Sequence, residues 1–474
     1  MSGSKKRSAS SQAAKGQAEP ELPDELEFED PYGDDVEEEE EDEEVIDGES
    51  EPIADAGSGP VKQVWRPGID KVADGEDLEY DPSAYIMYHS MSTEWPCLSF
   101  DFVRDTLGDN RHRFPLTAFM VTGSQADRSE RNKITLLKLS DLHKTHVKDS
   151  DDEASDDDDD DDHLDEDPTI EHMNVNHVGG VNRIRSMPQS PGIIATMAET
   201  GHAHVFDLTA GLNSMMGSGP RAPAPSKPIF SYTGHAEEGY AMDWNPVVAG
   251  RMVTGDNDGK IRLWNPSAAG GGSWQVDSKP FCGHTSSVED LQWSPTEGTV
   301  FASASADHSV RIWDVRDNSK AQIAIDAHTD DVNVISWNKN VGYLLASGCD
   351  DGSFKVWDLR AVKKGCTPLA HFTYHHEAIT SIEWASNDES VIALTCADNQ
   401  LTVWDLSVEA DDSTVAAAAA AQDPMADYPP QLLFIHQGQF NMKELHFHPQ
   451  IPGVIGSTAE NGFNFFKPAI TVSS

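Results

Sequence analysis

The feature that most constrains this chain is a sequence repeat. The stretch from Gly283 to Asp314 recurs almost unchanged from Ala327 to Asp358. Each copy contains a His after a small residue, an apolar segment that ends in Trp, a segment of small residues, an Asp-containing turn and an alternating segment that closes on Trp-Asp. This pattern predicts four short strands, and a four-stranded repeat is typical of one blade of a β-propeller.

The same pattern occurs in four further places, closely in two and loosely in two. The residues that define these units are His235 with Asp258 and Trp264, His376 with Asp398 and Trp404, His177 with Phe206 and Asp207, and His436 with Glu460 and Phe466. Strands expected within residues 114–142 supply a seventh unit that lacks the His. Because seven such blades close a ring, we expect an all-β, seven-bladed propeller over residues 97–474.

The repeat resembles the WD-repeat family. That resemblance implies that the His, a strand Ser or Thr, the turn Asp and the Trp of a blade form a buried, hydrogen-bonded chain, with Ser303 and Ser347 as candidates for the strand position. A buried polar group without a partner is costly, so such residues have a structural reason to be there. We therefore expect structural rather than catalytic roles for His284, His328, Asp307 and Asp351.

The sequence indicates a binding protein rather than an enzyme. The clustered His residues lie in repeat positions or expected loops without a set of ligands around them. No Ser, His and Asp set falls outside the repeat, and no Gly-rich phosphate loop precedes a helix. We therefore expect no catalytic residue, no metal and no cofactor, although a propeller fold alone does not exclude catalysis.

Two acidic runs carry most of the formal charge of −48. Residues 19–55 contain 21 acidic residues and residues 149–167 contain 14, and neither run contains Lys or Arg. Such runs repel themselves and cannot bury a core, so we expect disorder over residues 1–60 and in the insertion 149–167. They are either solubility tails or electrostatic sites for basic proteins, and their field disfavours direct nucleic-acid binding.

The acidic residues that we expect to shield a basic partner are Glu37, Glu38, Glu39, Glu40, Glu41, Asp156, Asp157, Asp158, Asp159 and Asp160. Ser150 and Ser155 precede dense carboxylate runs, a pattern that acidophilic kinases select. These two residues are either phosphorylation sites or spacers. Phosphorylation would add about 1.5 to 2 negative charges at each site at neutral pH.

The cysteines and the apolar pattern indicate a soluble intracellular protein. The chain has five Cys without a CxxC pair, so neither a disulfide framework nor a zinc site is implied. No apolar run approaches the length of a membrane span, and the N-terminus has no apolar signal core. We expect no membrane contact and a monomer.

The segment before the first repeat predicts a helix followed by a strand. Asp81 and Pro82 suit a helix start, and the stretch from Ser83 to Met91 then places apolar residues at helical spacing within the N-terminal segment 61–96. Residues 98–103 alternate like a strand. We expect this strand to close the ring by pairing with the last repeat around residues 462–466.

The string from Ser92 to Ser99 after this expected helix, and a late insertion at 408–430 that ends in Tyr428-Pro429-Pro430, resemble the retinoblastoma-associated histone-binding propellers. In that family an N-terminal helix and a Pro-Pro loop flank a groove for a histone helix. The resemblance implies a partner-binding groove formed by Tyr85, Tyr88, Met91, Tyr428, Pro429, Pro430 and Leu432. The acidic tail, the string and the acidic insertion resemble one branch more closely, the glutamate-rich WD-repeat proteins.

That branch includes fungal chaperones of newly made large-subunit ribosomal protein L-three. The resemblance therefore implies a ribosome biogenesis factor that shields a basic ribosomal protein and meets pre-ribosomal particles indirectly, in the nucleus and nucleolus with a cytoplasmic pool. A histone chaperone or chromatin-complex subunit is one alternative. A ubiquitin-ligase substrate receptor is another, for which the Asp-x-Arg endings at 314–316 and 358–360 are the cue.

One further set of residues recurs at the start of each expected blade. WD-repeat proteins place the residue after the first apolar position around the central opening of one face. This alignment predicts either a peptide-binding face or a solvated rim that contains Asn182, Tyr240, Glu289, Asn333, Thr380 and Lys443.

Overall fold

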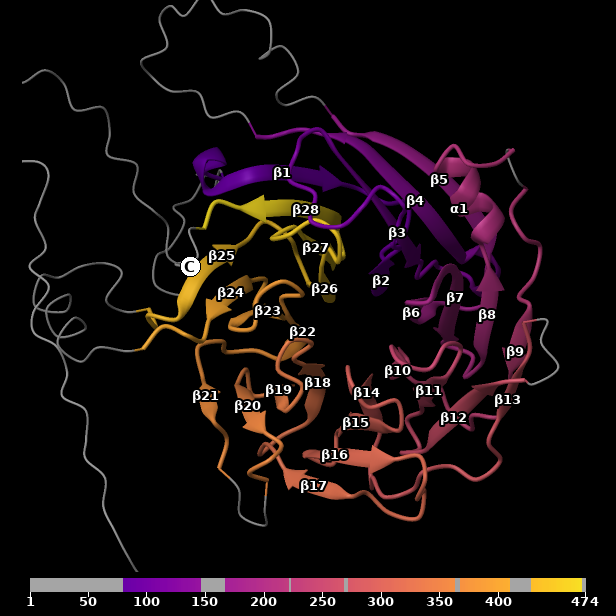
Figure 1. The fold of residues 1–474 in the computed structure, drawn as a ribbon, viewed down its shortest axis with the longest axis vertical. Helices are drawn as coiled ribbons and strands as arrows, with labels where there is room; N and C mark the ends of the chain where they lie inside the picture. The colour runs from indigo at the N-terminus through magenta and orange to yellow at the C-terminus, as the bar shows by residue number, and fades with distance from the viewer. Residues whose placement is uncertain are drawn as a thin grey trace, which may run out of the picture. The chain divides into compact units, whose positions relative to one another are not determined.

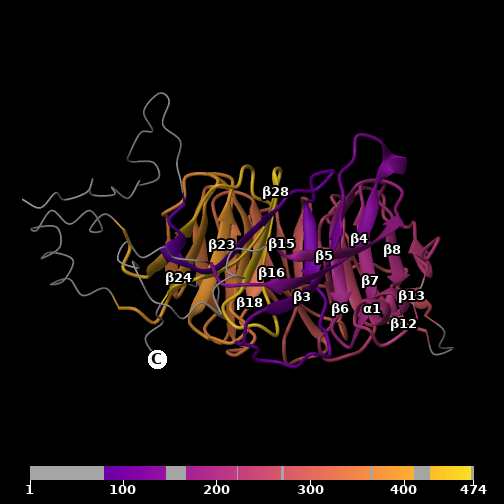
Figure 2. The same ribbon diagram turned by 90° about the horizontal axis from the view of Figure 1, so that it is seen from above.

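The computed structural model describes residues 80–145, 167–220, 223–267, 272–362, 367–409 and 428–470. These residues form seven antiparallel sheets of four strands each, arranged as blades around a central axis (Figure 1). Seen from the side, the ring is one layer of blades whose strands run between its two faces (Figure 2). The expected all-β, seven-bladed propeller is confirmed.

Blades 3 to 6 contain the closely matching repeats. From the central axis outward, their strands are β10 (Met242–Trp244), β11 (Met252–Gly255), β12 (Ile261–Pro266) and β13 (Trp274–Val276) in blade 3, and β14 (Val288–Trp293), β15 (Val300–Ser305), β16 (Ser309–Asp314) and β17 (Ile323–Asp326) in blade 4. Blade 5 consists of β18 (Val332–Trp337), β19 (Leu344–Cys349), β20 (Phe354–Asp358) and β21 (Ala370–Phe372). Blade 6 consists of β22 (Ile379–Trp384), β23 (Val391–Cys396), β24 (Leu401–Asp405) and β25 (Leu432–His436).

The loosely matching units form blades 1, 2 and 7. Blade 1 consists of β2 (Ser99–Phe102), β3 (Leu116–Gly123), β4 (Lys133–Leu142) and β5 (Thr169–Asn176), with a short 3-10 turn, η2 (Ser129–Arg131), between β3 and β4. Blade 2 consists of β6 (Val181–Met187), β7 (Ser190–Ala198), β8 (Ala203–Asp207) and β9 (Phe230–Tyr232). Blade 7 consists of β26 (Glu444–Phe447), β27 (Ile455–Ala459), β28 (Gly462–Pro468) and β1 (Tyr85–Met91).

The helix expected over residues 83–91 is wrong. Asp81 and Pro82 do start a helical turn, but it is the 3-10 turn η1 (Pro82–Ala84), in which the Asp81 carboxylate accepts a hydrogen bond from the Ser83 backbone N–H at 3.0 Å. The next residues form strand β1, which pairs antiparallel with β28. The edge of β28 offers β1 backbone hydrogen bonds along its length, with one irregularity between Tyr85 and Met87, and these two residues point into the blade core.

The ring is therefore closed by a different strand from the one expected. Residues 98–103 do form a strand, but β2 is the innermost strand of blade 1 and pairs with β3, not with the last repeat. The acidic insertion falls within blade 1, between β4 and β5. The prediction that an N-terminal strand closes the ring is confirmed. The strand that does so is β1, not β2.

The helix α1 (Thr209–Met215) was not expected from the sequence. It follows β8 and packs Leu212 among the buried residues that blades 1 and 2 share. Gly211 allows this close approach, because a Cβ there would lie 2.4 Å from the end of the Met173 side chain. None of the described helices is long and apolar enough to cross a membrane.

The closure predicts a specific effect at Gly462. Its φ is +127°, and an added Cβ would lie 2.2 Å from the Met91 backbone oxygen of β1. We expect Gly462→Ala to lower the free energy of unfolding by about 2 kcal/mol or more, measured by urea denaturation followed through Trp fluorescence. Gly438→Ala is the control, because its φ is +101° but no atom lies within 4 Å of its added Cβ. Equal losses in the two variants would show that the contact with β1 is unimportant.

Candidate functional site

The repeated His residues are part of the blade framework. In blade 4, His284 lies 2.9 Å from the Asp307 carboxylate and 2.6 Å from the Ser303 hydroxyl, which also accepts a hydrogen bond from Trp313 Nε1 at 2.8 Å. In blade 5, His328 contacts Ser347, but its other ring nitrogen lies 3.2 Å from Ser353 Oγ rather than contacting Asp351 directly. The expected hydrogen-bonded chain is complete in blade 4, whereas in blade 5 it links His328, Ser347 and Trp357 and leaves Asp351 exposed.

Two of the expected partners in this chain are wrong by one or two residues. His235 contacts Asp256 at 2.8 Å, whereas Asp258 pairs with Lys260 on the surface. In blade 6, His375 rather than His376 contacts Asp398, at 2.9 Å. In each case the structure buries one residue, Asp256 or His375, and leaves its near neighbour, Asp258 or His376, exposed. The sequence pattern fitted either residue.

The two loosely matching units use other partners for their His. His177 contacts the backbone oxygen of Gly179 and the hydroxyl of Thr196. His436 stacks on Phe466 and contacts Tyr85 and Asn464, not Glu460. The side chain of Glu460 instead reaches Asn441.

Groups of His, Cys and Asp lie close together in blades 5 and 6: His328, Cys349 and Asp351, and His375, Cys396 and Asp398. In the second group both ring nitrogens of His375 already have partners, Asp398 and Thr402. The Cys396 thiol donates to the Glu377 backbone oxygen at 3.1 Å, and burial raises its pKa to about 12. This chemistry fits a small buried thiol in the blade framework.

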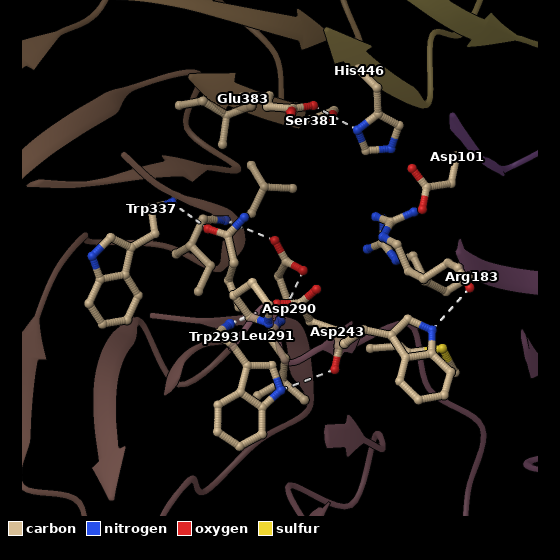
Figure 3. Close-up of a pocket in the computed structure, with 18 of the residues that line it drawn as sticks. Asp101, Arg183, Asp243, Asp290, Leu291, Trp293, Trp337, Ser381, Glu383 and His446 are labelled. Atoms are coloured by element: carbon tan, nitrogen blue, oxygen red, sulfur yellow. Dashed lines mark hydrogen bonds and ion pairs between the residues drawn. The ribbon is translucent and has the colours of Figure 1, made fainter. Parts of the chain in front are cut away.

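The centre of the ring contains a cavity of about 260 Å³ lined by the innermost strands. Figure 3 shows side chains from several blades directed into this channel. Most blade junctions are bridged in the same way, because a side-chain oxygen on one innermost strand accepts a hydrogen bond from a backbone N–H of the next. The bridging oxygens belong to Ser99, Asp101, Asp243, Asp290, Gln292, Ser336, Ser381 and Glu444.

Glu444 connects blades 1, 2 and 7. One of its carboxylate oxygens lies 2.6 Å from Arg183 and 2.7 Å from Arg185, and the other accepts a hydrogen bond from the Phe100 backbone N–H at 2.8 Å. Burial acts to raise the pKa of Glu444, but the two arginines outweigh it and hold this pKa well below its usual range. Glu444 is therefore an ionised, fully paired carboxylate.

A second ionic group lies beside it in the channel. Glu383 contacts Lys339 at 3.1 Å and His446 at 2.7 Å. Burial alone would lower the pKa of His446, but Glu383 and Glu444 outweigh burial and raise it to about 9. His446 is thus charged at neutral pH.

Three further carboxylates in the channel, Asp101, Asp243 and Asp290, accept hydrogen bonds from backbone N–H groups but form no ion pair within 4 Å among the described residues. Burial raises the pKa of all three, and that of Asp243 to about 7. The lining thus contains five carboxylates and four cationic groups, counting His446 as charged.

The six residues predicted on one face lie at or just before the starts of innermost strands, so they do surround one end of the channel. Asn182 is buried and donates to Glu238 at 3.0 Å, and Asn333 donates to Asp350 at 2.6 Å. Thr380 contacts Thr395 at 2.9 Å. Lys443 contacts Asn441 at 2.7 Å, and burial lowers its pKa.

Tyr240 and Glu289 give this face its electrostatic character. Burial raises the pKa of Tyr240, and the charges of Glu238 and Glu289 raise it further. Burial also raises the pKa of Glu289, with Asp331 and Asp350 acting in the same direction. Arg183, which donates to the Tyr240 backbone oxygen at 2.7 Å, acts on both pKa values in the opposite direction. Carboxylates thus outnumber cations around this aromatic ring, and Lys443 lies away from it on blade 7.

The predicted groove residues lie on two elements, β1 and the segment that leads into β25. Tyr85 is a core residue, 7% exposed, whose hydroxyl lies 2.8 Å from His436 Nδ1 and whose ring meets Phe434 edge-on. Tyr88 is partly buried, accepts a hydrogen bond from Asn464 at 3.3 Å and has its ring 4.9 Å from the tilted ring of the exposed Tyr80. Met91 lies at the far end of β1 and packs against the core of blades 1 and 7.

The second half of the predicted groove lies on blade 6. The ring of Tyr428 is 6.2 Å from that of Tyr374, and Leu432 packs against the core between blades 5 and 6. Pro429 accepts a backbone hydrogen bond from Leu432, and Pro430 is exposed. The two halves meet through β25, whose residues Phe434 and His436 contact Tyr85.

Several predicted residues lie outside the described part of the chain. They are Glu37, Glu38, Glu39, Glu40, Glu41, Asp156, Asp157, Asp158, Asp159, Asp160, Ser150 and Ser155.

Sequence reasoning missed the channel residues altogether. Arg183 and Arg185 lie two positions apart on β6, and Glu444 and His446 lie two positions apart on β26. This spacing indicates that the two members of each pair point to the same face of their strand.

The raised pKa of Asp243 predicts that the stability of the protein depends on pH. Its folded pKa of about 7 exceeds its ordinary value of 3.8, so the stability present at low pH is lost as the pH rises from the ordinary value through about 7 and changes little above that. We expect Asp243→Asn, which keeps an acceptor for Trp293, to raise the midpoint of thermal unfolding by about 2 to 4 °C at pH 8 and by less at pH 5. The charged groups that act on Asp243 are Arg185, Asp290 and Lys339.

The matched control is Asp326→Asn, at an exposed position on the outer strand β17. This control should change the unfolding midpoint equally at both pH values. A pH-independent effect of Asp243→Asn would contradict the assignment of a raised pKa.

Two family models match the chain. The model described as histone-binding protein RBBP4 or a subunit of the CAF1 complex matches residues 75–143. The model described as WD domain, G-beta repeat matches residues 226–265, 276–314, 319–358 and 366–405, which span β9 to β24.

Three relatives match most of the chain. Glutamate-rich WD repeat-containing protein 1 of Dictyostelium discoideum is 51% identical over 417 residues, which cover 86% of this chain and 85% of the relative. Ribosome assembly protein rrb1 of Schizosaccharomyces pombe is 42% identical over 456 residues, with 93% and 92% covered, and Protein HEAT STRESS TOLERANT DWD 1 of Arabidopsis thaliana is 46% identical over 430 residues, with 86% and 91% covered. With such identity over nearly its whole length, the chain belongs to the WD-repeat family that includes glutamate-rich WD repeat-containing protein 1 and ribosome assembly protein rrb1.

Proposed function

We propose that this protein is a non-enzymatic ribosome assembly factor that binds and shields a basic large-subunit ribosomal protein of the L-three type before its assembly into pre-ribosomes. The observation that carries the proposal is the match, over 93% of the chain, to a relative named as a ribosome assembly protein. The charge of the chain supports the chaperone role, since two runs contain 35 acidic residues and no Lys or Arg.

The acidic runs supply the electrostatic part of this function. A ribosomal protein of this kind carries positive charge that awaits ribosomal RNA, and carboxylates take the place of the phosphates until then. RNA later displaces the carboxylates, because its backbone pairs more densely with Lys and Arg and releases counterions. Contact with pre-ribosomal particles is thus indirect, and the protein itself binds neither nucleic acid nor membranes.

The acidic side of the face at the end of the channel, around Tyr240 and Glu289, supplies the second part of this function. Tyr240 lies among Glu238, Glu289 and the more distant Asp331 and Asp350, so an arginine or lysine side chain placed there gains both ion pairing and contact with an aromatic ring. The rigid ring fixes the positions of these groups. We assign this face to recognition of the client.

A histone client is the alternative with a specific observation in its favour, namely the match of residues 75–143 to a histone-binding family model. The charge argument is the same for both clients. The substrate-receptor alternative has less support, because Arg316 and Arg360 bond within their own turns to Asp314 and Asp358.

We place the protein in the nucleus and nucleolus with a cytoplasmic pool, acting as a monomer.

The proposal predicts that the acidic runs act on the client and not on the fold. We expect removal of residues 19–55 and 149–167 to leave the unfolding midpoint unchanged and to lower the fraction of purified ribosomal protein L-three that stays in solution. The loss should shrink as salt rises, because screening already weakens the interaction. Pelleting assays at two salt concentrations measure this effect.

Two variants on the ring test the acidic face at the end of the channel separately from the acidic runs. Glu289→Gln on the acidic face should weaken client binding, whereas Glu297→Gln, an exposed position beyond the other end of β14, should not. Unchanged solubilisation by the deleted chain would remove the chaperone role, and binding of a core histone in preference to the ribosomal protein would favour the alternative.

We further propose that Ser150 and Ser155 are phosphorylated and that this strengthens client binding. Each phosphate adds about 1.5 to 2 negative charges beside the existing carboxylates. Mass spectrometry of the protein isolated from cells detects the modification, and the affinity gain should fall with rising salt. A gain that does not depend on salt would contradict an electrostatic role.

A further inference from the structure

Blade 5 differs from its neighbours at the turn that follows β19. In blades 3, 4 and 6 the Nδ1 atom of the repeated His lies 2.8 or 2.9 Å from an Asp carboxylate. In blade 5 the Nδ1 atom of His328 lies 3.2 Å from Ser353 Oγ instead, and Asp351 is exposed. Blade 5 therefore keeps the His and the Asp of the repeat without the direct hydrogen bond that joins them in the neighbouring blades.

A cysteine lies beside this His and this Asp. The thiol sulfur of Cys349, a ring nitrogen of His328 and a carboxylate oxygen of Asp351 all lie within 4.8 Å of one another. Cys349 is buried at the end of β19, and its thiol interacts with the Asp351 carboxylate. Three metal-binding atoms of different chemistry thus converge at one turn.

The positions of Cys349 and Asp351 are the two from which other blades reach their His. Asp256 of blade 3 takes the place of Cys349, since each donates its backbone N–H to the residue four positions on, and the Asp256 carboxylate bonds to the His of its blade. Asp307 of blade 4 takes the place of Asp351 and also bonds to the His of its blade. In blade 5 both positions hold a metal-binding side chain, and both direct it toward His328.

The other ring nitrogen of His328 supports a metal-binding role for Nδ1. Nε2 lies 2.7 Å from Ser347 Oγ. A neutral imidazole carries its hydrogen on only one nitrogen. With that hydrogen on Nε2, His328 donates to Ser347 and keeps the lone pair of Nδ1 for a metal. A hydrogen bond from the second ring nitrogen is the usual support of a metal-bound His.

Blade 6 contains the same three residue types in a different arrangement. Nδ1 of His375 lies 2.9 Å from Asp398, and Nε2 lies 2.9 Å from Thr402. The thiol of Cys396 donates to the Glu377 backbone oxygen at 3.1 Å. The protein itself thus satisfies both ring nitrogens in blade 6, which makes that blade an internal comparison for blade 5.

We propose that His328, Cys349 and Asp351 bind one Zn²⁺ ion in blade 5. Imidazole, thiolate and carboxylate are the ligand types of protein zinc sites, whereas Mg²⁺ and Ca²⁺ prefer oxygen ligands. The thiolate is the ligand form, so coordination releases the Cys349 thiol proton to solvent. Zinc–ligand distances of about 2.0 to 2.3 Å place the ligand atoms about 3.5 Å apart, and the exposed Asp351 side chain turns to close the group to that size. Water takes the fourth position on the exposed side.

Zinc at this turn also fixes part of the acidic face. Asp350, which lies between two of the ligands in the sequence, donates its backbone N–H to the Asp331 backbone oxygen at 3.0 Å and accepts a hydrogen bond from Asn333 at 2.6 Å. The metal joins this turn to His328 and so holds Asp350 beside the start of β18. The inference does not depend on the identity of the client.

The test uses the full chain, freed of metal by chelation, with Co²⁺ as a spectroscopic probe in place of Zn²⁺. A cobalt–thiolate bond gives a charge-transfer band in the near ultraviolet, which carboxylates, including those of the two acidic runs, do not give. We expect this band to saturate at one Co²⁺ per chain and to disappear when excess Zn²⁺ takes the same ligands. Zn²⁺ at about a hundred times its Kd should raise the unfolding midpoint by about 3 °C or more.

Variants locate the ion. Cys349→Ser should abolish the band and keep the fold, because Ser305 occupies the same position in blade 4. Cys396→Ser is the matched control in blade 6 and should keep the band. Asp351→Asn should weaken Co²⁺ binding by about tenfold or more, whereas Asp330→Asn, which removes the same charge at a nearby exposed position, should not. Because Asp351 is exposed, its variant tests the site even where Cys349→Ser lowers stability.

Three outcomes would overturn the inference. The first is the absence of a charge-transfer band in the wild-type chain. The second is a band that survives Cys349→Ser or that Cys396→Ser removes, because the ion would then be bound by another cysteine. The third is Co²⁺ binding without the band that Asp330→Asn weakens, which would place the ion at the exposed group formed by His308, Asp330 and Asp331.

Discussion

The structure depends on how neighbouring innermost strands are joined across the channel. Each such strand pairs with its blade on one side and leaves backbone N–H groups unpaired on the other, which is costly in a buried channel. Side-chain oxygens such as those of Asp243 and Glu444 accept these hydrogen bonds from the next blade. Each blade is therefore fixed by both of its neighbours, and the faces keep their shape without a bound partner.

The repeat and its buried chain could be predicted because their signals are local. The spacing of His284, Asp307 and Trp313 depends only on the turns between adjacent strands. The strand formed by residues 85–91 could not be predicted in this way. Their apolar spacing suits a helix, but the deciding hydrogen bonds come from β28, at the far end of the chain. Long-range pairing here overrides a local preference.

The same reasoning explains why the face was found and the channel was not. Tyr240 and Glu289 follow a fixed position in each repeat, so alignment alone places them together. Arg183 and Glu444 are neighbours only because the ring brings blade 2 close to blade 7. The cavity between blades 7 and 1 likewise needs β5 beside the segment after β1, and no spacing in the sequence indicates that contact. Sites formed between blades become visible only with the closed ring.

Closure by β1 also sets an order for synthesis of the protein. The ribosome makes β1 first and its partner β28 almost last. Tyr85 and Met87, which the finished blade buries, therefore have no native partner until nearly the whole chain has emerged. A chain that stops before β28 leaves β1 as a lone apolar strand and the last complete blade without its neighbour. Such a product has unpaired strand edges, so we expect incomplete copies of this protein to aggregate rather than to form partial rings.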